Sequence, residues 1–272
     1  MKKALIALAL IVVFATTSFA SVSFLTAPGI GEGKIGVLGF YGTNHVGPTS
    51  MSGGDPTDLS TNDLTNLGIR GCYGVMPDLD VLAAYSFDTL PNVKKLSLGD
   101  QVFTDFPGGS VKQLSANSLA LGAKYTVLKE TKDIPVDIAV AVGYEQSVQK
   151  IRASATGYSG DMGTGQSAMI LGGIVSKKID NMVPYGALAY KALTMNKHRL
   201  PGIQKWDAAA GSAIALNLGL MYGIADNMAI AGEYNLEMQS WSETKQSGMD
   251  DGKTRAYHDT VSGISLGFAY MF

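Results

Sequence analysis

Cysteine and histidine are nearly absent from this sequence of 272 residues. Cys72 is the single cysteine, so no disulfide can form within the chain. The three histidines, His45, His198 and His258, leave few ligands for a metal centre. Charged residues make up only 16% of the chain, and the formal net charge of -2 gives no reason to expect a nucleic-acid partner. We therefore predict neither a metal site nor a cofactor.

Long apolar runs are also missing, except at the N-terminus. There Lys2 and Lys3 precede an apolar run over 4–15, and a Ser-Phe-Ala site follows. This pattern predicts a Sec signal peptide over 1–20 and one domain over 21–272. A short membrane anchor is the alternative, but the run is shorter than the ~20 residues that a spanning helix needs. Any other passage through a membrane must therefore use β-strands.

What the chain does have is a repeat. Five segments contain Leu-Gly, four of them with an aromatic residue shortly afterwards, and they recur at intervals of about 50 residues, which suits a hairpin and a loop. Five hairpins predict a ten-stranded up-and-down antiparallel barrel, with the first strand near 34–42. A twelve-stranded barrel is the alternative, because 91–113 is long enough to contain another hairpin around 96–106. The repeats are LGIRGCYGV (67–75), LALGAKYTV (119–127), MILGGIVSKK (169–178), LNLGLMYGI (216–224) and ISLGFAYMF (264–272).

The last repeat alternates strictly between large apolar residues and small ones. Ile264, Leu266, Phe268, Tyr270 and Phe272 would share one face of a strand. A strand that alternates in this way and ends the chain on Phe resembles the terminal strand of bacterial outer-membrane β-barrels of the Gram-negative type. The resemblance implies an outer-membrane location among lipids and lipopolysaccharide. It also implies that the barrel-assembly machinery recognises Tyr270 and Phe272 and that this strand closes the barrel against the first.

Short and long connections alternate between the predicted strands. Brief turns are expected at 77–80, 129–135, 180–183 and 225–227, and long polar loops at 43–63, 91–113, 151–166, 195–208 and 240–259. In the barrels that this chain resembles, short turns face the periplasm and long loops face the outside. All three histidines fall in the predicted loops, and Trp206 and Trp241, close to loop ends, are expected at the membrane interface.

The hairpin around 225–227 makes the sharpest prediction of register. With those three residues as the turn, Leu218 pairs with Tyr234 on the apolar face and Asn217 pairs with Asn235 on the polar face. A slip of one residue would turn Glu233 into lipid. The same alternation, read along the other strands, gives the candidates that line the lumen: Arg70, Lys124, Asp137, Glu145, Asn217, Glu233, Asn235 and Glu237, with Asp88 and Lys191 as further members. Strands one and six are apolar on both faces and cannot be oriented.

Two functions fit such a lumen. Ten strands lie near the closed end of the range of barrel widths, because eight are already filled by side chains. The protein is then either a small porin-like passive channel for small polar solutes or ions, with Arg70, Glu145 and Glu233 at its constriction, or a closed barrel that serves as a scaffold, adhesin or surface-binding protein.

Enzymatic chemistry has little support in the sequence. The stretch 29–34 resembles a phosphate-binding loop but lacks its first glycine and its Ser or Thr, so it is read as a flexible lead into strand one. Ten strands is also the number in the omptin family of outer-membrane proteases, yet no matching Asp-x-His motif is present. An outer-membrane hydrolase is only a minor alternative, and we predict no catalytic residues.

Overall fold

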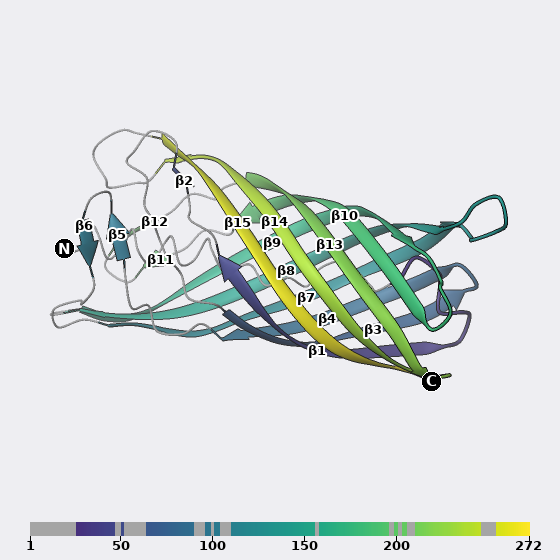
Figure 1. Cartoon of the computed structure of the whole chain (residues 1–272). Helices are drawn as coiled ribbons and strands as arrows, with labels where there is room; N and C mark the ends of the chain where they lie inside the picture. The colour runs from purple at the N-terminus through teal and green to yellow at the C-terminus, as the bar shows by residue number, and fades with distance from the viewer. Residues whose placement is uncertain are drawn as a thin grey trace.

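The computed structural model describes residues 26–46, 50–51, 64–89, 96–98, 101–103, 110–155, 158–195, 199–200, 203–205, 210–245 and 254–272. Ten long antiparallel strands form a closed barrel, in which neighbours along the chain are neighbours in space (Figure 1). The barrel strands are β1 (Ile35–Val46), β3 (Leu64–Met76), β4 (Leu79–Thr89), β7 (Ser110–Leu128), β8 (Asp137–Ala155), β9 (Tyr158–Ser176), β10 (Met182–Met195), β13 (Ala210–Ala225), β14 (Met228–Lys245) and β15 (Thr254–Met271).

The first and last strands close the barrel, as predicted. β1 pairs with β15 from Gly36 opposite Met271 to Val46 opposite Val261. Phe272 extends the pairing, since its N–H donates to the carbonyl of Ile35 over 2.8 Å. The sheet therefore has no open edge along this seam, which a lipid-facing wall requires.

Short pairings lie outside the ten-stranded cycle. β2 (Ser50–Met51) adds two residues beside β15, β5 (Leu96–Leu98) pairs with β6 (Gln101–Phe103), and β11 (Arg199–Leu200) pairs with β12 (Ile203–Lys205). The suspected hairpin near 96–106 thus exists, but its two strands pair with each other and not with the barrel wall. The ten-stranded prediction is confirmed and the twelve-stranded alternative is wrong.

The predicted register of β13 and β14 is confirmed over most of its length. Leu218 lies opposite Tyr234, and Asn217 lies opposite Asn235. The turn itself is one residue shorter than predicted. A three-residue turn at 225–227 would pair Met228 with Ile224, but Met228 pairs with Ala225. An irregularity in the ladder between 223 and 225 absorbs the extra residue, so the two-residue turn at 226–227 keeps the rest of the register.

Several strands run further than their apolar residues do. β8 and β9 continue through most of 151–166, which we predicted as a long loop, and only 156–157 separate them. His45 and His258 likewise lie on β1 and β15 and not in loops, while His198 is outside the described residues. Polar side chains mark where a strand leaves the apolar layer, but backbone pairing between antiparallel neighbours does not need apolar side chains and continues beyond it.

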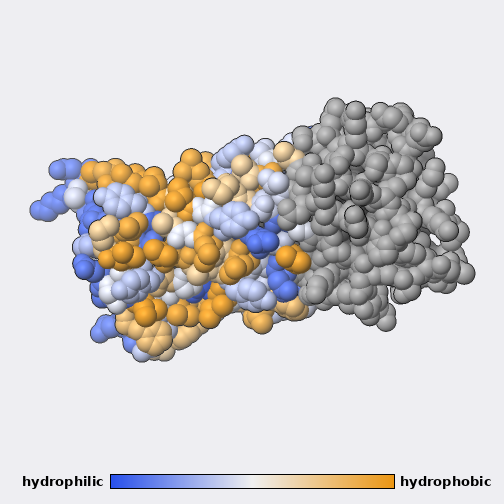
Figure 2. Space-filling model, turned by 180° about the vertical axis from the view of Figure 1, so that it is seen from behind, coloured by the Kyte–Doolittle hydropathy of each residue, from blue (hydrophilic) through white to orange (hydrophobic). Residues whose placement is uncertain are grey.

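The outer wall carries a belt of apolar side chains, and Figure 2 shows one face of it on the described part of the barrel. Alternate residues of each strand contribute to the belt, and Leu218 is 50% exposed where its neighbour Asn217 is only 3% exposed. No helix within the described residues is long and apolar enough to span a membrane. Exposed members of the belt include Leu67, Ile69, Leu121, Val142, Leu171, Leu188, Ile230, Phe268 and Leu266.

Candidate functional site

The inside of the barrel collects the charged side chains of the strands. All eight residues predicted to line the lumen are buried, on the strand face opposite the apolar belt: Arg70, Lys124, Asp137, Glu145, Asn217, Glu233, Asn235 and Glu237. Asp88 and Lys191 are buried as well, and so is Asp80, which we did not predict. Most of these charged side chains lie in three clusters, at the middle of the lumen and towards either end.

The middle cluster joins strands that are not neighbours. The guanidinium of Arg70 on β3 donates to both carboxylate oxygens of Glu233 on β14, over 3.1 and 3.5 Å. The Tyr185 hydroxyl on β10 donates to the same carboxylate over 3.0 Å. Bidentate pairing of this kind fixes the geometry of both groups. Because β1 and β15 separate β3 from β14, the pair crosses the interior instead of following the wall.

Aromatic rings fill the space around this cluster. The Arg70 guanidinium carbon lies 4.5 Å above the centroid of the Phe40 ring, a cation–π distance. Glycines make room for both rings: a Cβ on Gly68 would lie 2.4 Å from Phe40, and one on Gly219 would lie 2.2 Å from Tyr185. β1 therefore turns Phe40 inward, which its sequence, apolar on both faces, did not reveal.

The second cluster lies around Lys191, towards the end of the long connections. The Lys191 ammonium on β10 is 3.1 Å from Glu145 on β8 and 2.8 Å from Glu237 on β14. Ser118 donates to Glu145 over 3.0 Å, and Gln239 donates to Glu237 over 2.8 Å. A small cavity beside these groups has room for about one water molecule. Glu145 thus belongs to this cluster, so the predicted constriction of Arg70, Glu145 and Glu233 is split between two levels.

Trp241 extends the same cluster from β14. It is 1% exposed, and its indole N–H donates to the Gln239 side-chain oxygen over 3.2 Å. Our assignment of Trp241 to the membrane interface is therefore wrong. Trp241 lies an even number of residues from Glu233 and Glu237, and this parity places it inside the barrel. Trp206 lies outside the described residues.

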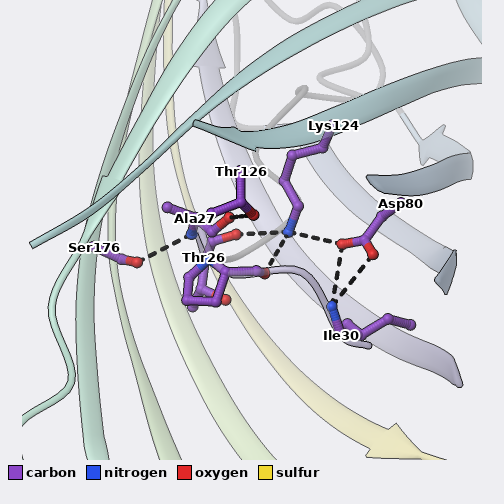
Figure 3. A network of polar contacts seen from close by, with 8 residues as sticks. Thr26, Ala27, Ile30, Asp80, Lys124, Thr126 and Ser176 are labelled. Carbon is purple, nitrogen blue, oxygen red and sulfur yellow. Dashed lines mark hydrogen bonds and ion pairs between the residues drawn. The ribbon is translucent and has the colours of Figure 1, made fainter. Parts of the chain in front are cut away.

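The third cluster lies at the short-turn end and contains a segment of the chain itself. Residues 26–30 lie inside the mouth of the barrel, as Figure 3 shows. The Lys124 ammonium contacts Asp80 over 3.1 Å and donates to the carbonyls of Thr26 and Pro28 over 2.8 and 2.9 Å. The stretch 29–34, which we expected to be a flexible lead into strand one, therefore begins within a bound segment.

Two hydroxyl groups and a carboxylate also form hydrogen bonds with this segment. Thr126 donates to the carbonyl of Ala27 over 2.9 Å, and the Ala27 N–H donates to the Ser176 hydroxyl oxygen over 3.0 Å. The N–H of Ile30 donates to the Asp80 carboxylate over 3.3 Å. No periodic pattern of residues marks these contacts, because they involve the main chain of 26–30 and not its side chains.

Two more of the predicted residues, Asp137 and Asp88, have local partners. Asp137 accepts the N–H of Glu130 over 2.7 Å and so orders the 129–136 turn. Asn66 donates to Asp88 on the neighbouring strand. Within the described residues no group of three or more His, Cys, Asp or Glu side chains could hold a metal ion.

Asp80, Phe40 and Tyr185 are among the lumen residues that sequence reasoning missed. Asp80 shares the parity of Ser86 and Asp88 on β4, so alternation along that strand was a sufficient signal. We had read it instead as part of the turn. Tyr185 shares the parity of Lys191 on β10, so alternation was a sufficient signal there too. Phe40 had no such signal, because β1 is apolar on both faces.

Comparison with known proteins bears on the fold. No protein-family profile and no curated protein sequence matches the chain. Among solved structures, the outer membrane protease OmpT from Escherichia coli is similar, with a TM-score of 0.51 and 13% identity, over 94% of this chain and 100% of that one. The translocator domain of the autotransporter NalP from Neisseria meningitidis has a TM-score of 0.44 and 12% identity, over 87% and 88%. These comparisons concern the fold alone: the chain is a closed, ten-stranded antiparallel β-barrel of the kind that OmpT forms in the outer membrane.

Proposed function

We propose that this protein is a closed outer-membrane barrel that acts as a scaffold or surface-binding protein and does not conduct solutes in its resting form. It presents its long connections outside the cell and its short turns to the periplasm. The observation that carries the proposal is the Arg70–Glu233 pair, which crosses the lumen between strands separated by two others.

Solute passage would require the ion pairs of Arg70 and Lys191 to separate inside the barrel. Arg70 and Lys191 have side-chain exposures of 4% and 3%, and the carboxylates they meet are equally buried. Removing one partner from a buried ion pair costs about 3 to 5 kcal/mol, so separation of such a pair is a rare event. The bound segment at 26–30 adds a further barrier at the periplasmic mouth.

Swelling of proteoliposomes in isotonic solutions of small amino acids and sugars tests this proposal. Vesicles that contain the folded, heat-modifiable protein should swell no faster than vesicles without protein. Swelling that becomes faster as the solute becomes smaller would contradict it and favour a channel.

A small porin-like passive channel is the second candidate, favoured by the balance of charge in the lumen. Three buried cations, Arg70, Lys124 and Lys191, face six buried acids, Asp80, Asp88, Asp137, Glu145, Glu233 and Glu237. An acidic lumen would favour cations. If swelling occurs, the reversal potential in a salt gradient should therefore show selectivity for cations.

We also propose that the protein is not an enzyme. OmpT is described as a protease, but its likeness to this chain concerns the fold. Among the described histidines, His45 and His258 are exposed on β1 and β15, outside the lumen. The purified barrel should therefore leave a quenched fluorescent peptide substrate intact, and hydrolysis that follows the folded protein would contradict this.

Export and assembly complete the proposal. The N-terminal 20 residues would direct the chain to the Sec pathway, and Tyr270 and Phe272 would present the last strand to the barrel-assembly machinery. The surrounding partners are outer-membrane lipids, including lipopolysaccharide.

A further inference from the structure

The periplasmic mouth of the lumen is lined by groups that bind a peptide main chain. Lys124 and Thr126 donate to main-chain carbonyls of 26–28, while Ser176 accepts a main-chain N–H. These three side chains come from β7 and β9, far along the chain from the segment that they hold (Figure 3). None of these contacts involves a polar side chain of the bound segment.

The buried Lys124 ammonium depends on the bound segment for most of its hydrogen-bond acceptors. An ammonium group has three hydrogens to donate, and here Asp80, Thr26 and Pro28 accept them. Without the segment, the buried ammonium would lose two of those three acceptors. Thr126 and Ser176 would lose their contacts to Ala27 at the same time.

One position of the segment is selected by size. The Ala27 side chain is fully buried, and it packs in a cluster with Ala139, Ala141, Ile174 and Ala187. Because Ala27 is fully buried in this cluster, a larger side chain would have to displace the wall around it. The mouth therefore combines main-chain recognition with one pocket for a small side chain.

The segment is joined to β1 by a turn that contains two glycines. Gly31 and Gly33 have φ angles of 97° and 75°, in the left-handed region that favours glycine. The N–H of Gly33 donates to the carbonyl of Gly74 over 2.8 Å, so this turn is anchored to the wall of the barrel. Residues 26–30, which precede this turn, are held by the side-chain contacts described above.

We propose that the periplasmic mouth is a peptide-binding site, and that residues 26–30 of the same chain occupy it as a releasable plug. The ligand class is an extended peptide with a small residue at the position of Ala27. Release pivots about the glycine turn and leaves the site open to a second peptide of the same kind. This inference goes beyond the proposed function, because it holds whether or not the upper lumen conducts.

The test uses the full mature chain with Ala27→Trp, which cannot enter the pocket, and Glu32→Trp as a control of equal bulk at an exposed position. A fluorescent peptide with the sequence TAPGIGEGK, that of residues 26–34, is titrated into each refolded protein. Saturable binding is expected for Ala27→Trp only, since the chain's own segment fills the mouth of the wild type and of the control. A folded, heat-modifiable Ala27→Trp barrel that does not bind the peptide would overturn the proposal.

A second variant tests the same proposal if Ala27→Trp fails to fold. Thr126→Val with Ser176→Ala removes two anchors and adds no bulk. Hydrogen exchange of a proteolytic fragment covering 26–34 should become about tenfold faster or more in this variant, because exchange follows the population in which the segment has left. Unchanged exchange in a folded barrel would overturn the proposal.

Discussion

Arg70 on β3 and Glu233 on β14 form a bidentate ion pair across the lumen, with nitrogen–oxygen distances of 3.1 and 3.5 Å. The two strands lie on either side of the β1–β15 closure, so this pair connects both sides of the seam from within. The backbone bonds of β1 and β15 close the barrel in its wall, and the ion pair braces the same region in its interior.

Breaking this pair should destabilise the barrel. Glu233→Leu leaves the buried Arg70 guanidinium without its carboxylate and should lower the free energy of unfolding by about 3 to 5 kcal/mol. The double variant Arg70→Met with Glu233→Leu removes both charges and should lose much less than the sum of the two single variants. Urea unfolding in lipid vesicles measures both effects, and additive losses would show that the two residues are not coupled.

The glycine opposite Tyr185 is a second point of tight packing. A Cβ on Gly219 would lie 2.2 Å from the Tyr185 ring, so Gly219→Val should cost about 1 to 3 kcal/mol through overpacking. Gly173→Val is the control, because Gly173 is exposed on the outer wall and a Cβ there would be 3.9 Å from its nearest neighbour. Equal effects in an unfolding titration would contradict the packing of Tyr185 in the lumen.

The sequence predicted the barrel wall well because lipid imposes a period of two on every strand. The repeat at intervals of about 50 residues predicted the number of strands, and the period of two predicted the pairing of Leu218 with Tyr234 and the burial of Glu233. The period of two could not orient β1, because Phe40 is as apolar as the residues that face lipid. The space left by Gly68 accommodates the Phe40 ring inside the barrel.

The contacts inside the lumen could not be predicted in the same way. Which charges meet across the barrel depends on how the sheet closes and on the stagger of its strands, and this brings Glu145 to Lys191 instead of to Arg70. The bound segment at 26–30 was missed for a different reason. It is held through main-chain atoms, so its residue types carry little trace of the contacts.

The two faces of the wall should respond differently to the same substitution. Leu218→Arg places a cation in the apolar belt, where Arg or Lys costs about 2 to 4 kcal/mol near the bilayer midplane. Asn217→Arg places the cation in an acidic lumen and should impair insertion far less, although it must displace neighbouring side chains. Heat-modifiability after refolding into vesicles measures inserted protein, and equal loss in the two variants would refute the assignment of faces.

The last residue should contribute to assembly through both its backbone and its ring. Deletion of Phe272 removes the N–H that bonds to Ile35 and should lower the amount of barrel assembled in the outer membrane. Phe272→Ala keeps that bond but loses the ring, which is 71% exposed, so it should give an intermediate amount. Quantifying folded protein in outer-membrane fractions compares the variants, and wild-type amounts from the deletion would count against a role in assembly.

Single-channel recording in planar bilayers tests the central claim of a closed lumen most directly. We predict that the mature, heat-modifiable protein inserts without stepwise currents, because the Arg70–Glu233 pair and the Lys191 cluster cross the interior. Stepwise currents that follow the folded protein and are absent from protein-free bilayers would contradict the account and establish a channel.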